Sequence, residues 1–211
     1  MAYPTVSAPY GLKPVNLIGG QVYAGSTRLL KIASGYAADL FYGDVVKLVN
    51  TGTIQKETGT TTVSAQGVVG IFMGCTYTDP SSKQPRWSQY WPASTVASDA
   101  QAYVVDDPDV LFKVAAVSAT TTVAFYGQTV VGTNVSLVQN SGSTTTGDSA
   151  VAIDGTSAAA TASLPVRIVA GVPDTANASG EFCEFICKFN APYFDTDHIA
   201  GGHMYLNPTG V

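Results

Sequence analysis

Charged side chains are scarce in this sequence. Asp, Glu, Lys and Arg make up 12% of the 211 residues, about half the usual share of ~25%. A free monomer generally carries more charge than this for solubility. The deficit therefore favours a protein whose surface is partly covered by partners, although neutral Ser and Thr surfaces also hydrate well.

Clustered cations and long apolar runs are also missing. The ten Lys and Arg residues form no run and the net charge is −5, whereas nucleic-acid binding depends on clustered cations that displace phosphate counterions. The first twenty residues lack the cationic start and unbroken apolar stretch of a signal peptide. No stretch approaches the about 18 apolar residues of a transmembrane helix. We expect neither direct nucleic-acid contact nor a membrane span, and synthesis in a reducing cytoplasm.

Cysteine is rare, with Cys75, Cys183 and Cys187 as its three occurrences. On one strand, Cys183 and Cys187 would lie ~13 Å apart, which is beyond disulfide reach. A lone C-x-x-x-C pair without a second Cys or His pair is a poor zinc signal. The pattern predicts free, buried thiols.

Catalytic constellations are absent as well. The sequence contains no G-x-S-x-G turn, no P-loop, no G-x-G-x-x-G fingerprint and only two histidines, His198 and His203. Acyl transfer needs a nucleophile with a base in reach, and nucleotide binding needs a phosphate-binding loop. We predict no catalytic residues, no cofactor and no enzyme activity.

Two polar clusters offer metal-ligand atoms. Asp106, Asp107 and Asp109 surround Pro108, but the glycine and bidentate glutamate of a calcium loop are missing, so a turn between two strands is favoured. A second cluster, in a glycine-rich setting, consists of Asp195, Asp197, His198 and His203. Hydrogen-bonding side chains of a C-terminal tail are favoured there over a transition-metal site. We predict no metal and leave both alternatives open.

Short apolar or alternating runs, separated by Gly, Asp, Asn, Ser and Thr, fill the chain from Ser26 onward. Such runs are typical of strands and turns. In residues 181–189 the alternation places Cys183 and Cys187 on one face and Glu184 on the other, which predicts a half-buried strand with inward thiols. The sequence predicts an all-β fold, a β-barrel or β-sandwich with very little helix.

The predicted organisation has three parts. An extended arm covers residues 1–25, a β domain covers residues 26–194, and a C-terminal tail covers residues 195–211. Within the β domain, residues 139–162 are rich in small polar side chains and are expected to form a long loop or a weak hairpin. No internal repeat with a fixed period is found.

Prolines and aromatic residues mark the arm, because such spaced prolines forbid a helix and discourage a central strand. We expect it to bind a neighbouring subunit, the alternative being an irregular lead-in packed on its own domain. The candidate interface residues are Tyr3, Pro4, Pro9, Tyr10, Leu12, Pro14 and Tyr23.

A second aromatic group gathers in the middle of the chain: Tyr77, Trp87, Tyr90 and Trp91. Such rings can form a platform on which sugars stack. Their spacing equally fits a loop pinned to a core or an interface, and we favour packing or an interface.

Four blocks of sequence resemble small structural proteins of tailed-bacteriophage heads. They are APYGLKPV (residues 8–15), GVVGIFMGCTYTDPSSKQPRWSQYWPAST (67–95), TGDSAVAID followed by SLPVRIVAG (146–154 and 163–171), and CKFNAPYF (187–194). In many relatives the last block looks like N-x-H-x-Y. Here Asn190, Pro192 and Phe194 stand instead, so no role of that histidine carries over.

The resemblance implies a capsid decoration or cement protein, often a homotrimer, that binds the major capsid protein on the exterior of the virion. Two alternatives remain. One is another virion component, such as the major capsid or tail-tube protein, although the common shell subunit needs a long spine helix that the sequence does not predict. The other is a carbohydrate-binding receptor module that uses Trp87, Tyr90 and Trp91.

Overall fold

The computed structural model describes residues 6–64, 67–191, 193–195, 198–200 and 202–207, and this part of the chain is built of β-strands with no α-helix. The expected all-β fold is confirmed. The strands are β1 (Lys13–Leu17), β2 (Arg28–Ile32), β3 (Val45–Leu48), β4 (Thr53–Lys56), β5 (Gly70–Thr78), β6 (Pro85–Ser88), β7 (Gln101–Val105), β8 (Val110–Val117), β9 (Asn134–Val138), β10 (Ala152–Ala159), β11 (Val166–Gly171), β12 (Glu184–Phe189), β13 (Tyr193–Asp195) and β14 (His198–Ala200). Short 3-10 helices are η1 (Gln128–Val130), η2 (Pro173–Thr175) and η3 (Met204–Leu206).

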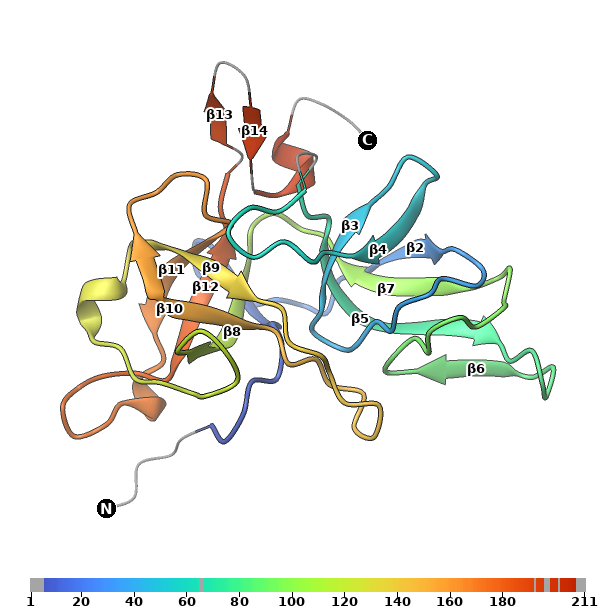
Figure 1. Ribbon diagram of the computed structural model, residues 1–211, viewed down its shortest axis with the longest axis horizontal. Helices are drawn as coiled ribbons and strands as arrows, with labels where there is room; N and C mark the ends of the chain where they lie inside the picture. The colour runs from blue at the N-terminus through green and yellow to red at the C-terminus, as the bar shows by residue number, and fades with distance from the viewer. Residues whose placement is uncertain (1–5, 65–66, 192, 196–197, 201, 208–211) are drawn as a thin grey trace.

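The first half of the chain forms a closed barrel (Figure 1). Its strands follow the order β3, β4, β2, β7 and β5, and β5 pairs again with β3 to close the ring. The strand β6 forms a hairpin with β5 and pairs with residues 75–78, beyond the part of β5 that pairs with β3. Large apolar side chains fill the barrel, among them Phe72 and Trp91.

The second half forms another closed barrel, with the order β8, β10, β9, β11 and β12 and a closing pair between β12 and β8. Here the added strand is β1, which pairs with the start of β8. Phe112, Phe185 and Cys187 lie in its core. The alternation predicted for residues 181–189 is confirmed, because Cys183, Phe185, Cys187 and Phe189 are all buried.

The two barrels have the same topology. In each, the first strand pairs in parallel with the third and antiparallel with the last, as β2 does with β4 and β7, and β8 with β10 and β12. The second strand pairs antiparallel with the third and the fourth, as β3 does with β4 and β5, and β9 with β10 and β11. The fourth and last strands carry a β-bulge in both barrels.

Short stretches of sequence follow this duplication. LLKI in β2 matches LFKV in β8, and VGIFMG around β5 matches VRIVAG in β11. Lys113 follows Lys31 by 82 residues, whereas Val166 follows Val69 by 97 residues. The spacing drifts because the connecting loops differ in length, so the repeat has no fixed period.

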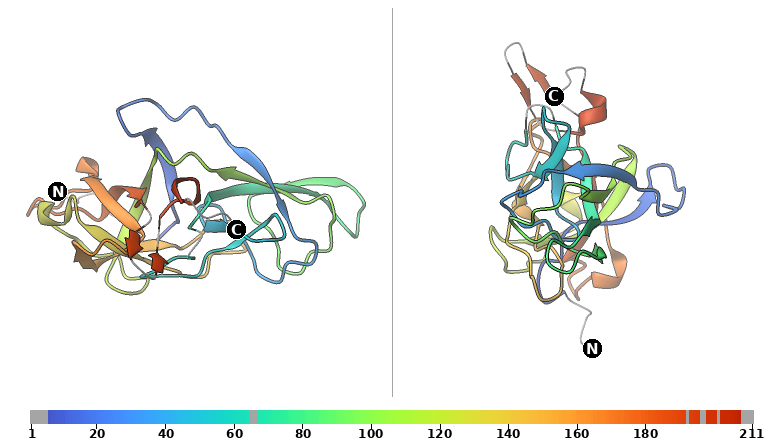
Figure 2. Two further views of the ribbon diagram at one scale, coloured as in Figure 1. Left: turned by 90° about the horizontal axis from the view of Figure 1, so that it is seen from above. Right: turned by 90° about the vertical axis from the view of Figure 1, so that its right-hand side faces the viewer.

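The barrels lie side by side along the longest axis, the first on the right of Figure 1 and the second on the left; the view from above in Figure 2 agrees. Val45, Ile71 and Val105 of the first barrel belong to the buried cluster that fills the second. This shared cluster joins the halves, and the region expected as one β domain consists of two fused barrels.

Two parts of the predicted organisation need correction. Residues 9–17 of the expected arm belong to the fold, since Pro9 and Leu12 are buried and β1 is a strand of the second barrel. Pro14 is compatible with β1 because β1 is the edge strand of its sheet, and an edge strand can lack a backbone donor. In addition, residues 139–162, expected to form a long loop or a weak hairpin, contain β10, which pairs antiparallel with β9 as a wall of the second barrel.

Candidate functional site

The aromatic group in the middle of the chain is divided between core and surface. Trp91 is completely buried and meets Tyr77 edge to face, with ring centroids 5.2 Å apart. Tyr90 stacks on Phe41 at 5.8 Å. Trp87, by contrast, is 71% exposed. The group therefore does not form one platform: Tyr77 and Trp91 are packing residues, as one of the two sequence interpretations held, and Trp87 alone offers a free ring.

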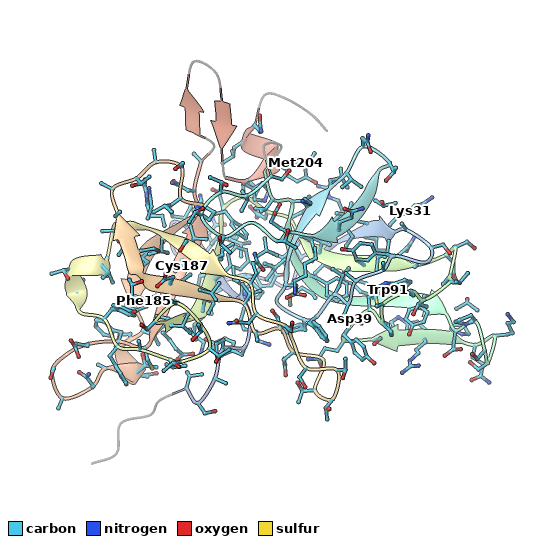
Figure 3. The ribbon with its side chains drawn as sticks, viewed as in Figure 1. Lys31, Asp39, Trp91, Phe185, Cys187 and Met204 are labelled. Carbon is cyan, nitrogen blue, oxygen red and sulfur yellow. The ribbon has the colours of Figure 1, made fainter. Side chains whose placement is uncertain are left out.

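Strand alternation explains why Trp87 is exposed. Trp87 on β6 pairs with Thr76 on β5, and Thr76 points away from the barrel because its neighbours Cys75 and Tyr77 point inward. Trp91 lies beyond the end of β6, where its backbone bonds Leu40 at 2.8 and 3.1 Å and its ring enters the barrel. Figure 3 shows Trp91 within the right half of the molecule.

The exposed ring borders an apolar surface on the outside of the first barrel. Leu29 on β2 is 50% exposed and pairs directly with Tyr103 on β7. Tyr103, Met73 and Trp87 line a cavity of about 390 Å³. We refer to the surface made by Leu29, Lys31, Met73, Trp87 and Tyr103 as the open face. The cavity is also bordered by Tyr42 and Gln89.

Tyr10 and Tyr23 of the expected arm contact the protein's own second barrel. The Tyr10 hydroxyl donates a hydrogen bond to Glu184 Oε1, and its ring lies 5.7 Å from Lys113 Nζ. Burial, and then the bond to Glu184, raise the pKa of Tyr10. Tyr23 donates to the carbonyl of Ser26, 2.7 Å away. Tyr3 and Pro4 lie outside the described residues.

A buried polar cluster joins the barrels. Asp44 Oδ2 accepts hydrogen bonds from the Phe41 amide at 2.9 Å and from Lys56 Nζ at 3.0 Å, and Asp44 Oδ1 accepts from Ser149 Oγ at 2.6 Å. Ser149 belongs to the loop before β10, whose backbone bonds Tyr42 at 2.9 and 3.0 Å. This loop is thus held by the first barrel. Sequence reasoning missed Asp44, because its partner Ser149 lies 105 residues away.

The acidic turn forms the connection from β7 to β8, so the predicted turn between two strands is confirmed. Asp106 pairs with Arg28 and accepts from the Tyr205 hydroxyl at 3.0 Å. Asp107 accepts from the Asp109 amide at 2.8 Å, and Asp109 pairs with Lys188 at 2.8 Å. These carboxylates are therefore engaged with protein groups. Within the ranges that the structure describes, no three His, Cys, Asp or Glu side chains gather as a metal site would require.

His203, of the C-terminal cluster, is 1% exposed, and its Nδ1 accepts from the Tyr205 amide at 3.3 Å. Burial lowers the pKa of His203 to about 4. The residues on either side bond to Val68, which holds this segment against the first barrel. Asp197 lies outside the described residues, and Asp195 and His198 are described only as backbone in β13 and β14.

The cysteines are free and buried, as predicted. Burial raises the pKa of the Cys75 thiol to about 12 and also raises that of Cys187. Cys75 Sγ lies 3.5 Å from the Tyr90 carbonyl, to which it donates. Since the thiolate is the reactive form, these groups are poor nucleophiles.

Comparison with known proteins identifies no relative: no protein-family model, no curated protein and no solved structure matches this chain. None of the helices in the described ranges has the length and apolar character needed to span a membrane.

Proposed function

We propose that this chain is a structural virion protein, a capsid decoration or cement protein that binds the exterior of a tailed-phage head. The sequence blocks that resemble head proteins carry this proposal. The supporting structural observation is that three of these blocks meet where the barrels join: Gly11 of the first block lies against Ser149 of the third, and Gln89 of the second bonds Asp148 of the third.

The junction is tight enough to need those residue types. A Cβ on Gly11 would lie 2.7 Å from Ser149 Cβ and 2.9 Å from the Gly43 carbonyl oxygen. Gly11 lies in the first block and Ser149 in the third, while the second block contributes Gln89, whose Nε2 lies 3.1 Å from Asp148 Oδ1. The resembling residues thus fix how the two barrels join, and a rigid double barrel suits a protein that fastens neighbouring capsomers.

A lattice-bound part does not need strong individual contacts, because symmetry repeats each of them many times. The low charge and the apolar open face suit such contacts. The major shell subunit is a weaker candidate, since the described residues contain no α-helix that could act as its spine. A carbohydrate module is weaker too, because only Trp87 of its three proposed rings is well exposed.

Binding to heads tests the proposal. The purified protein is mixed with heads, prepared without it, of a phage whose genome encodes this chain, and bound protein is measured after sedimentation. We expect saturation at a fixed number of copies per major capsid subunit, and heads that resist heat better when saturated. Absence of binding, or binding without saturation, would contradict the proposal. Binding to host glycans instead would favour the receptor module.

A further inference from the structure

The two barrels differ in how the outer face of their first and last strands is covered. In the second barrel, Lys113 on β8 and Glu184 on β12 point outward from neighbouring strands, and their charged ends lie 3.3 Å apart. The Tyr10 ring lies over Lys113, and its hydroxyl bonds Glu184. Tyr10, which precedes β1, therefore covers part of the outer face of β8 and β12, most completely at Glu184, whose side chain is 6% exposed.

The same position in the first barrel is uncovered. Lys31 on β2 corresponds to Lys113 on β8, since LLKI matches LFKV and each of these strands is the first of its barrel in the sequence. Lys31 is exposed and has no ion pair or hydrogen-bonding partner for its side chain within the described ranges. Its neighbours Leu29 and Tyr103 form a direct cross-strand pair; Leu29 is half exposed and Tyr103 is partly buried. The open face is thus the counterpart of a face that is covered elsewhere in the same molecule.

Charge is divided unequally between the barrels. Residues 28–105 contain six basic residues (Lys and Arg) and five acidic residues (Asp and Glu). Residues 106–211 contain three basic and ten acidic residues. The first barrel is therefore slightly positive and the second strongly negative. The open face carries Lys31, whose side chain has no ion-pairing partner among the described residues. A second copy that approaches with its acidic barrel is favoured, because opposite charges steer association.

The N-terminal segment leaves from the acidic barrel. The described chain begins in the half of the molecule that holds the second barrel, away from β6 (Figure 1), and Lys31 lies in the half opposite to Phe185 and Cys187 (Figure 3); Figure 2 gives two further views. A compact chain of this length spans about 40 Å, whereas residues 1–5 reach at most about 17 Å. Residues 1–5 are therefore short compared with the span of the molecule, which favours the open face of a neighbouring copy over that of the same chain.

We propose that the open face binds residues 1–8 of a second copy of this chain, in a head-to-tail contact. Tyr3 and Pro4 precede the buried Pro9 and the partly buried Tyr10, which also pair a proline with a tyrosine, in the reverse order. Tyr3 of one copy covers Lys31 of its neighbour, as Tyr10 covers Lys113 within the chain. The other side chains of residues 1–8 enter the neighbour's cavity beside Trp87. Because each copy has one segment and one open face, the contact repeats and closes into a ring, or extends as a chain if the rotation does not close.

Mass in solution, measured by light scattering over a range of concentrations, tests the contact. We expect the full chain to form oligomers whose fraction rises with concentration. A variant lacking residues 2–7 and the variant Leu29→Asp should each be monomeric, with circular dichroism and melting temperature like those of the full chain. Val22→Asp is the matched control, because Val22 is 76% exposed outside the open face and its substitution should leave the oligomer intact.

Mixing the two defective variants gives the decisive result. The truncated variant retains the open face and Leu29→Asp retains the segment, so the head-to-tail contact predicts that an equimolar mixture forms a dimer of one copy of each. A full chain that stays monomeric at every concentration, or variants that oligomerise like the full chain, would overturn the proposal. A mixture that stays monomeric would also overturn it. The heads play no part, so these outcomes are independent of capsid binding.

A synthetic peptide of residues 1–10 provides a second readout. Added to the truncated variant, it should change the tryptophan fluorescence, because Trp87 is exposed beside the cavity whereas Trp91 is buried. The change should disappear in Trp87→Phe. A saturating peptide that leaves the fluorescence and the melting temperature of the truncated variant unchanged would show that the open face does not bind this segment.

Discussion

Asp44 is the charged residue most deeply enclosed in the described structure, with no exposed surface. Its carboxylate accepts hydrogen bonds from both barrels and pairs with Lys56, whose side chain is 14% exposed. A buried carboxylate is tolerated only with such partners. Asp44 thus fixes how β3, β4 and the loop before β10 meet.

Replacement of Asp44 by alanine should therefore destabilise the protein strongly. Asp44→Ala leaves the Lys56 ammonium largely buried and unpaired, and breaking a buried ion pair costs about 3–5 kcal/mol. The matched variant Asp109→Ala removes a carboxylate that is 61% exposed and pairs with Lys188, so its cost should stay below about 1 kcal/mol. Urea unfolding measures both free energies. If the two variants lost similar amounts of unfolding free energy, Asp44 would not have the stabilising role that we assign to it where the barrels join.

His203 should make stability depend on pH. Burial lowers the pKa of His203 to about 4, against 6.5 for a free imidazole, and this outweighs the opposing effect of Asp106 and Asp107, while Lys188 lowers it further. Between these values the unfolded chain binds a proton that the folded chain excludes, so the free energy of unfolding falls as the pH drops from 6.5 to 4.

The expected loss over that range is about 3 kcal/mol, since one pKa unit corresponds to about 1.4 kcal/mol. His203→Gln keeps an acceptor for the Tyr205 amide and should lack this part of the pH dependence. Urea titrations at a series of pH values compare the two proteins. Parallel curves for wild type and variant would show that His203 does not titrate with unfolding.

Sequence reasoning predicted burial at single residues wherever a strand alternates clearly, as for Cys183 and Cys187. It did not separate Trp87 from Trp91, because the division depends on where β6 ends and the chain turns into the barrel. It also missed Asp44, whose environment is assembled from distant parts of the chain.

At the scale of elements, the turn at Gly11 is the tightest approach between the segment before β1 and the first barrel. Gly11 has φ +81°, and a Cβ would meet backbone atoms of Gly43. Gly25 has the same φ but open space around it. An alanine at position 25 would therefore suffer backbone strain alone, whereas an alanine at position 11 would suffer the same strain and a steric clash.

Gly25→Ala should cost about 1–2 kcal/mol, the strain of a left-handed conformation in an L-residue. Gly11→Ala should cost clearly more, because the junction must also move to make room for the methyl group. Thermal unfolding of both variants measures the difference. Equal melting temperatures would show that the junction yields easily and does not fix the barrels.

The segment around β1 should behave as part of the fold. Leu12 is 1% exposed, and removal of a buried leucine side chain typically costs about 2–5 kcal/mol. A variant lacking residues 2–25 loses Leu12 and β1 together and should not fold, whereas one lacking residues 2–7 should fold. Circular dichroism and solubility distinguish these outcomes. A folded protein without residues 2–25 would restore the view of these residues as a separate arm.

The elements themselves could largely be predicted, because most strands coincide with apolar or alternating runs. The strand β1 was missed since prolines at Pro9 and Pro14 indicate an arm. The strand β10 was indicated only as part of a weak hairpin or a loop because it carries small residues, and Gly155 shows why they are small: a Cβ there would lie 2.2 Å from the Tyr126 ring. Close packing required small side chains that resemble those of a loop.

At the scale of the whole molecule, two barrels of one topology differ in charge and in the covering of their outer faces. The duplication could not be found from a fixed period, because loop lengths differ between the halves. Because of the duplication, one barrel has a covered outer face and the other has the open face. The two ends of the molecule therefore differ. A directional building block that is low in charge fits the proposed repeated attachment to a lattice.

The most direct test of this account is an electron-microscopy map of the heads of a phage that encodes this chain. The account predicts density for two fused barrels on the outer surface, repeated at symmetry-related positions and touching neighbouring capsomers. A map in which the chain is absent from the head exterior, or in which it forms the shell wall itself or the tail tube, would contradict it.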